Sequence, residues 1–223
     1  MNKISFCGVS KAYSNGAEAL SEISVELKEG EMNFLTGPSG AGKSTFLRLI
    51  LRQHKASKGK VLVNEVDLAQ ISDRNLPHYR RGLGVVFQDP HLLMNRTVAE
   101  NIAVPLSLTG ISDKVCYRRV RAALTIVGLE DRATHMPGNL SAGERQRIGI
   151  ARAVVMRPKV LLADEPTGNL EPELSVRVIE LFSQFTEIGS IVVIASHDLF
   201  LIENLKARVI ELRRGRINSD SQG

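Results

Sequence analysis

Short apolar runs alternate along this chain with longer stretches whose apolar residues recur at helical spacing. The short runs are bounded by Gly, Pro or Asp and predict strands at residues 4–6, 23–27, 32–35, 60–63, 83–87, 160–163, 191–195 and 208–212. The helical patterns begin after Gly42 and cover residues 115–127, 144–155 and 173–185. This alternation predicts an α/β fold with a mostly parallel central sheet. We expect antiparallel strands on its N-terminal side and a late hairpin that turns at Arg214 and Gly215.

The segment between the fifth and sixth predicted strands interrupts this alternation. Residues 90–138 contain no strong strand pattern and predict a helical insertion. We therefore expect one domain over residues 1–217, with a helical subdomain at about residues 90–150. The polar residues 218–223 predict a disordered tail.

Charge and composition narrow the classes of partner. The net charge is +5, and basic clusters occur at residues 78–81, 117–121 and 213–216. Solvated helix and loop faces are the simpler explanation, and a face held near anionic phospholipids is the alternative. Nucleic-acid binding is disfavoured because Trp is absent and aromatic residues, at 4%, do not interleave with the basic runs.

Targeting signals and cysteines bear on the cell compartment. No apolar run approaches the roughly 18 to 20 residues of a membrane-spanning helix, and the N-terminus lacks the apolar core of a signal peptide. Cys7 and Cys116 are too few for a disulfide framework or a metal cluster. These features predict a cytoplasmic protein with reduced thiols.

A glycine-rich segment after the strand at residues 32–35 carries the clearest chemical motif. It matches the P-loop pattern G-x-x-x-x-G-K-[ST] over Gly37, Pro38, Ser39, Gly40, Ala41, Gly42, Lys43 and Ser44. Glycines let the backbone wrap closely around phosphates, so its N–H groups and the N-terminus of the helix at Thr45 converge on them. The lysine can reach the β- and γ-phosphates and the serine hydroxyl can bind Mg²⁺. The motif predicts binding of ATP or a related nucleotide.

Two acids end the apolar run at residues 160–163. In such sheets ligands bind at the carboxyl ends of the strands. Asp164 is therefore predicted to hold Mg²⁺, directly or through water. Glu165 can polarise the attacking water. Together with the P-loop, this pair predicts hydrolysis of the nucleotide.

Further motifs occur in an order that resembles the ABC family of ATPases across nearly the whole chain. Taken alone, each of these residues more often has a structural role than a functional one. They are Tyr13, which resembles the aromatic residue that stacks on adenine; Gln88, which resembles the Q-loop glutamine; the signature segment Leu140, Ser141, Ala142, Gly143 and Glu144; the D-loop residues Gly168, Asn169, Leu170 and Glu171; and His197, which resembles the switch histidine.

The resemblance implies a P-loop NTPase fold and a homodimer that forms on ATP binding. Two copies would meet head to tail, with ATP between one P-loop and the other copy's signature segment. Ser141 and the Gly143 backbone would then contact the γ-phosphate across the interface, with Ala142 and Glu144 beside them. Gln88 would sense Mg²⁺ and the attacking water, and His197 would stabilise charge at the γ-phosphate.

Three residues depart from the family pattern. Ala142 replaces a glycine but keeps the backbone N–H, so turnover is expected to persist at a lower rate. Glu144 replaces a glutamine, a variation that the most similar subfamilies share. Glu171 replaces the D-loop aspartate, which puts the geometry of communication between the two copies in doubt.

The segments at residues 9–13, 87–106 and 162–170 resemble the FtsE family of bacterial cell-division ATPases. This resemblance implies an integral membrane partner like FtsX and a place at the cytoplasmic face of the bacterial inner membrane. The lipoprotein-release ATPase LolD and MacB-type pumps are the alternatives. ABC ATPases without a membrane partner act in DNA repair, where they carry long coiled coils, or on the ribosome, where one chain carries two ATPase domains. This class is disfavoured because the chain has neither feature. A small-molecule kinase is disfavoured by the signature segment and His197.

Three apolar residues in succession, Leu92, Leu93 and Met94, follow Gln88 closely. They either close the small core of the helical insertion or line an exposed groove. A groove there would receive a cytoplasmic helix of the membrane partner.

Overall fold

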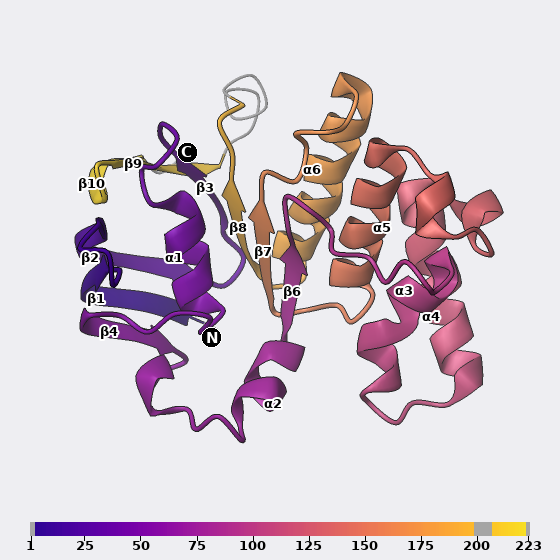
Figure 1. Ribbon diagram of the computed structural model, residues 1–223, viewed down its shortest axis with the longest axis horizontal. Helices are drawn as coiled ribbons and strands as arrows, with labels where there is room; N and C mark the ends of the chain where they lie inside the picture. Colours follow the sequence, from indigo (N-terminus) through magenta and orange to yellow (C-terminus); the bar gives the residue numbers. More distant parts are fainter. Residues whose placement is uncertain (1–2, 199–206, 222–223) are drawn as a thin grey trace.

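The computed structural model describes residues 3–198 and 207–221. Within these residues the chain forms two sheets and a group of helices (Figure 1). A four-stranded antiparallel sheet has the order β2-β1-β4-β5, and a six-stranded sheet has the order β10-β9-β3-β8-β7-β6. This architecture confirms the predicted α/β fold with antiparallel strands on the N-terminal side.

The central sheet is covered on both faces. Five of its strands run parallel to one another, namely β3 (Met32–Thr36), β6 (Leu83–Val86), β7 (Val160–Asp164), β8 (Ile191–Ala195) and β9 (Arg208–Arg213). Alternate residues of one strand enter different cores: on β8, Val192 and Ile194 face the cluster around the helices, whereas Ile191 and Val193 face the cluster around α1. Burial on both faces explains why these strands read as continuous apolar runs.

The N-terminal sheet consists of β1 (Lys3–Ala12), β2 (Glu18–Lys28), β4 (Lys58–Val63) and β5 (Val66–Asp67). Both β1 and β2 extend well beyond their predicted lengths. Their register shifts between Phe6 and Val9, next to Gly8 with φ of 58°. Such a bulge breaks the apolar alternation, which is why the sequence indicated only a short first strand.

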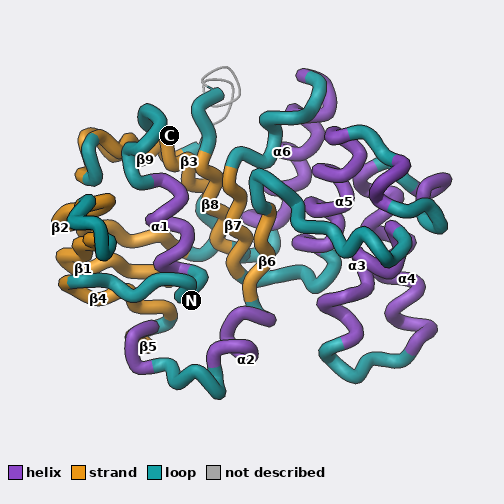
Figure 2. Tube along the Cα trace, viewed as in Figure 1, coloured by secondary structure: helices purple, strands orange, loops and turns teal. Residues whose placement is uncertain are grey.

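The described residues form six α-helices and three short 3₁₀ turns. They are α1 (Lys43–Ile50), α2 (Leu76–Arg81), α3 (Val98–Ser107), α4 (Asp113–Val127), α5 (Ala142–Val154) and α6 (Pro172–Glu187), with short 3₁₀ turns at Leu68–Gln70, Glu130–Arg132 and Pro137–Asn139. Figure 2 shows α3, α4 and α5 grouped to the right of β6, as predicted for a helical insertion. Among the helices that the structure describes, none has both the length and the apolar character to cross a membrane.

The C-terminus differs from the prediction. Residues 218–221 are ordered in β10 (Arg216–Ser221), which pairs antiparallel with β9 and closes the predicted hairpin; residues 222 and 223 lie outside the described part. Arg208 forms a two-pronged ion pair with Asp220, at 2.7 Å for each nitrogen. An edge strand held by backbone bonds and ion pairs needs few apolar residues, so its composition resembles that of a tail.

Candidate functional site

The P-loop follows β3 and leads into α1. Gly37, Gly40 and Gly42 have φ of 127°, 77° and 111°, the left-handed region that favours glycine. A Cβ at Gly37 would lie 2.1 Å from the carbonyl oxygen of Leu212, and one at Gly42 would lie 2.6 Å from that of Ala19. Two of these glycines are therefore required by space as well as by conformation.

The far end of α1 is held by α2. The Tyr79 hydroxyl donates to the carbonyl of Ile50 at 2.6 Å. Arg80 donates to the carbonyls of Leu51 and Arg52 at 3.0 and 2.9 Å. Burial raises the pKa of Tyr79, so its hydroxyl keeps the proton that it donates. These bonds satisfy carbonyls at the end of the helix and fix the position of α1 behind the P-loop.

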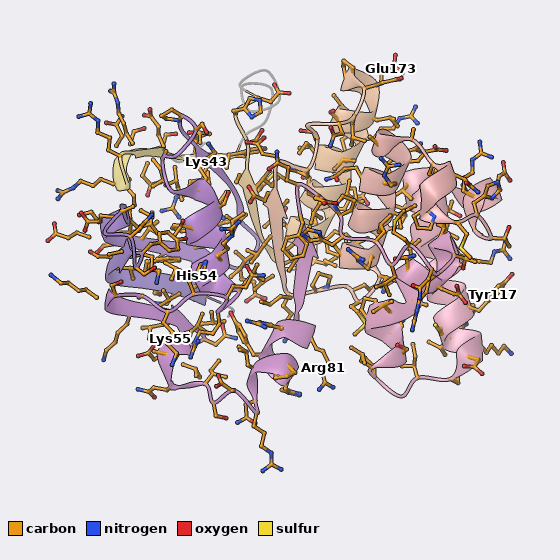
Figure 3. All side chains as sticks on the ribbon, in the orientation of Figure 1. Lys43, His54, Lys55, Arg81, Tyr117 and Glu173 are labelled. Atoms are coloured by element: carbon orange, nitrogen blue, oxygen red, sulfur yellow. The ribbon has the colours of Figure 1, made fainter. Side chains whose placement is uncertain are left out.

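A cavity of about 870 Å³ opens at the carboxyl end of the central sheet. Figure 3 shows Lys43 near the upper end of α1 and Glu173 at the top of α6. The lining contains every predicted P-loop residue from Gly37 to Thr45 and the predicted Tyr13, Gln88, Asp164, Glu165 and His197. It also contains Ala17, Glu18, Ala19, Gly168 and Asn169, of which the first three were not foreseen.

Lys43 and Tyr13 are both anchored at the edge of this cavity. The Lys43 ammonium donates to the carbonyl oxygens of Gly37 and Pro38, at 2.6 and 3.2 Å. The Tyr13 hydroxyl lies 3.1 Å from Thr45 Oγ1. Residues 17–19 reach the cavity because β2 starts beside the P-loop, a long-range placement with no local signal in the sequence.

Asp164 lies at the end of β7, half-buried in the cavity floor. Burial raises the pKa of this carboxyl, a hydrogen bond from Ser44 opposes that rise, and the neighbouring Glu165 adds to it. A carboxylate and a hydroxyl side by side offer the oxygen ligands that Mg²⁺ prefers.

Glu165 and His197 meet directly, although they were predicted separately. Glu165 Oε2 lies 2.9 Å from His197 Nδ1. The backbone of Glu165 has a φ of 48°, which is rare for a residue with a side chain. Its N–H donates to the carbonyl of Ala195 at 2.9 Å, so the neighbouring strand stabilises this conformation.

The signature segment lies at the N-terminus of α5. None of Ser141, Ala142, Gly143 and Glu144 lines the cavity of the same chain. Ser141 and Glu144 form a reciprocal capping box: Ser141 Oγ accepts from the Glu144 N–H at 3.1 Å, and the Glu144 carboxylate accepts from the Ser141 N–H at 2.8 Å. The Ser141 N–H is the main reason that the pKa of Glu144 is lowered. Because Ser141 Oγ is an acceptor here, its own O–H can donate to an anion.

The D-loop contacts the signature segment of the same chain. A Cβ at Gly143 would lie 3.1 Å from the carbonyl oxygen of Asn169. Ala142, in contrast, is exposed in the first turn of α5 and adopts the helical conformation that alanine favours. Glu171 stands at the N-cap of α6, and its side chain forms no capping bond there.

The three apolar residues after Gln88 divide between core and surface. Leu92 packs against the buried cluster around the helices, whereas Leu93 and Met94 are 41% and 58% exposed. The buried Asn101 accepts from the N–H of Leu93 at 2.8 Å and donates to its carbonyl at 3.0 Å. Asn101 also donates to the carbonyls of Arg96 and Thr97, so one side chain shapes this loop.

Comparison with known proteins extends over nearly the whole chain. Residues 20–168 match the family model described as ABC transporter. The chain is 48% identical to the cell division ATP-binding protein FtsE of Escherichia coli (strain K12), covering 96% of this chain and 97% of that protein. It is 45% identical to FtsE of Bacillus subtilis (strain 168), covering 95% and 93%.

Solved structures show the same fold. The ATP-binding cassette MJ0796, solved as a dimer in a post-hydrolysis state with ADP and Pi, has a TM-score of 0.92 at 32% identity, with 98% of each chain covered. A second dimeric structure of MJ0796, described as a bacterial ABC transporter cassette, has a TM-score of 0.93 with the same identity and coverage. The chain therefore belongs to the ABC transporter family of ATPases and, within it, to the FtsE family of cell-division ATP-binding proteins.

Proposed function

We propose that this chain is the ATP-binding and ATP-hydrolysing subunit of a membrane complex that acts in bacterial cell division. The observation that carries the proposal is the single cavity in which the P-loop, Asp164, Glu165, Gln88 and His197 converge. The names of the FtsE relatives support the cell-division role.

The P-loop and Asp164 bind the nucleotide with its metal. Backbone N–H groups from Gly37 to Thr45 surround the phosphates, and Lys43 turns from its own loop carbonyls to the β- and γ-phosphates. Ser44, Asp164 and Gln88 are the residues that would hold Mg²⁺, and the ion would neutralise charge on the phosphates. Tyr13 contacts the adenine at the rim.

Glu165 polarises the attacking water. Its contact with His197 Nδ1 orients both side chains toward the place where the γ-phosphate is cleaved. The other ring nitrogen of His197 then remains available to the phosphate. Gln88, which lines the same cavity, helps to position the water.

Glu165→Gln tests this assignment. We expect kcat to fall by more than about 100-fold, because a glutamine cannot act as a base, while ATP binding persists. Lys43→Ala should instead weaken ATP affinity by roughly ten- to hundredfold, because a charged hydrogen bond to the phosphates is lost. Steady-state turnover and equilibrium nucleotide binding distinguish the two. An unchanged kcat in Glu165→Gln would contradict the role of Glu165.

Two copies of the chain complete each other's sites. The dimeric structures of MJ0796 support a homodimer, and the placement of the signature segment outside the cavity of its own chain fits this arrangement. The Ser141 O–H and the Gly143 N–H donate to the γ-phosphate held by the other copy. The departures at Ala142 and Glu144 leave these donors in place.

The loop that contains Leu93 and Met94 is the docking site for an FtsX-like integral membrane partner. Both side chains are exposed, Asn101 holds the loop in shape, and Gln88 connects it to the catalytic cavity. Methionine repacks readily around a partner helix. Binding there places the chain at the cytoplasmic face of the bacterial inner membrane.

Leu93→Asp tests the docking site. We expect this variant to fold and bind ATP but to be lost from the membrane fraction, because a charge cannot enter an apolar contact. Ile188→Asp is a matched control, since Ile188 is 67% exposed at the end of α6. Circular dichroism, nucleotide affinity and membrane co-fractionation are compared. Loss of folding in Leu93→Asp would place Leu93 in the core, and equal recruitment of the two variants would exclude this docking site.

A further inference from the structure

Gln146, which none of the roles above uses, lies where three parts of the catalytic apparatus meet. Its side chain projects from α5 and is 1% exposed. Its Nε2 donates to the carbonyl oxygens of Phe87, at 3.2 Å, and Pro166, at 3.3 Å. Phe87 directly precedes Gln88, and Pro166 directly follows Glu165. One amide therefore joins the signature helix to the backbone beside both residues that act on the attacking water.

Stability alone does not explain a glutamine at this position. Among the described residues, the buried Oε1 of Gln146 has no hydrogen-bond partner. An unpaired buried acceptor is unfavourable, and an apolar side chain of the same shape, such as methionine, would pack without that cost. The two donors are what only the glutamine supplies. One of them holds the backbone next to Glu165, whose φ of 48° needs support from its surroundings.

Two more residues on the same face of α5 attach it to the segment that leaves Gln88. A Cβ at Gly149 would come within 2.8 Å of Pro90 Cβ, so helix and segment are in close contact. Arg152 donates to the carbonyls of Pro90 and His91. The spacing of Gln146, Gly149 and Arg152 by three residues makes one continuous contact face. A shift of α5 therefore moves residues 87–91 with it.

We infer that Gln146 is a positioning residue for ATP hydrolysis, an inference that rests on the proposed function. It holds Gln88 and Glu165 in a common arrangement with α5. The N-terminus of this helix, at Ser141, contacts the nucleotide of the other copy. When Ser141 contacts that nucleotide, the resulting shift of α5 is transmitted through the Gln146 side chain to Gln88 and Glu165 of the same chain.

Gln146→Met in the full chain tests the inference. We expect kcat to fall about tenfold or more with the KM for ATP within about twofold, because positioning is lost while the P-loop is untouched. The matched control is Asn33→Leu. Asn33 is 0% exposed, its Nδ2 donates to the carbonyls of Glu31 and Val192 at 3.3 Å, and its Oδ1 has no partner among the described residues. The control should keep the wild-type kcat.

A second readout separates positioning from general damage. In a Gln88→Ala background, Gln146→Met should lower kcat by a smaller factor than in the wild type, because Gln88 is then no longer there to be positioned. If the methionine variant does not fold, Gln146→Asn takes its place with the same expectation, since its amide is one methylene too short to reach both carbonyls. An unchanged kcat, an equal loss in the Asn33 control, or strictly multiplicative losses with Gln88→Ala would overturn the inference. A wild type without ATPase activity would overturn the proposed function itself.

Discussion

At the scale of single residues, the site contains groups whose position costs stability. Asp164 is half-buried, and burial raises the pKa of its carboxyl despite the hydrogen bond from Ser44. Glu165 has a left-handed backbone, and the Oε1 of Gln146 is buried without a partner in the described part of the chain. Such costs at neighbouring positions are typical of a functional site, where the arrangement is selected for chemistry rather than for folding.

The pKa of Asp164 leads to a prediction about stability. A carboxyl with a raised folded pKa binds its proton more tightly in the folded state, so stability falls as pH rises from the unfolded value of 3.8 through the folded pKa. We therefore expect Asp164→Asn to raise Tm at neutral pH, in buffer without nucleotide or Mg²⁺. The difference between the two proteins should shrink as pH falls toward 4, because the Asp164 carboxyl then becomes neutral like the asparagine amide. Thermal unfolding across this range is the measurement, and a lower Tm for Asp164→Asn at pH 7 would contradict the prediction.

At the scale of the elements, helix termini carry much of the site. The capping box of Ser141 and Glu144 explains how a carboxylate replaces glutamine at the end of the signature segment: it accepts the Ser141 N–H. At the start of α6, Glu171 occupies the N-cap with an extended backbone, yet its longer side chain forms no cap. The α6 N-terminus is therefore less well satisfied than that of α5.

Glu171→Asp should repair this end of α6. A shorter carboxylate at the N-cap can accept from the N–H of Glu173 or Leu174, and such caps contribute about 0.5–2 kcal/mol. We expect the free energy of unfolding in urea to rise by roughly 0.5–1 kcal/mol. Glu171→Gln, which keeps the length of the side chain, is the control and should leave stability nearly unchanged. An equal gain in both variants would show that charge, rather than capping, is responsible.

At the scale of the whole molecule, the division of each site between two copies has a testable consequence. Neither Lys43→Ala nor Ser141→Arg alone can form an intact site. In a mixed dimer, the P-loop of the Ser141→Arg copy meets the signature segment of the Lys43→Ala copy, which restores one site of two. We expect ATP-dependent dimers to reappear on mixing, measured by sedimentation without Mg²⁺. A mixture that stays monomeric, while the wild type dimerises and both variants fold, would argue against composite sites.

The sequence by itself determined those features that depend on neighbouring residues. The P-loop needs eight consecutive residues, and its glycines Gly37, Gly40 and Gly42 stand where φ is positive. The strands of the central sheet were identifiable because burial on both faces leaves continuous apolar runs. The capping box of α5 follows from the spacing of Ser141 and Glu144. In each case the signal is a pattern of residues that lie close together in the sequence.

Only the tertiary structure decided the contacts between distant segments. Glu165 and His197 are 32 residues apart and meet because β7 and β8 are adjacent parallel strands that end together. Gln146 reaches backbone 59 residues away, and the loop that exposes Leu93 is held by the side chain of Asn101, which accepts a hydrogen bond from the Leu93 N–H. Residues 218–221 of β10 were wrongly predicted as a disordered tail, because an edge strand is stabilised by its ladder and by ion pairs rather than by apolar burial. No local pattern encodes such contacts, because they depend on how the two sheets and the helices pack together.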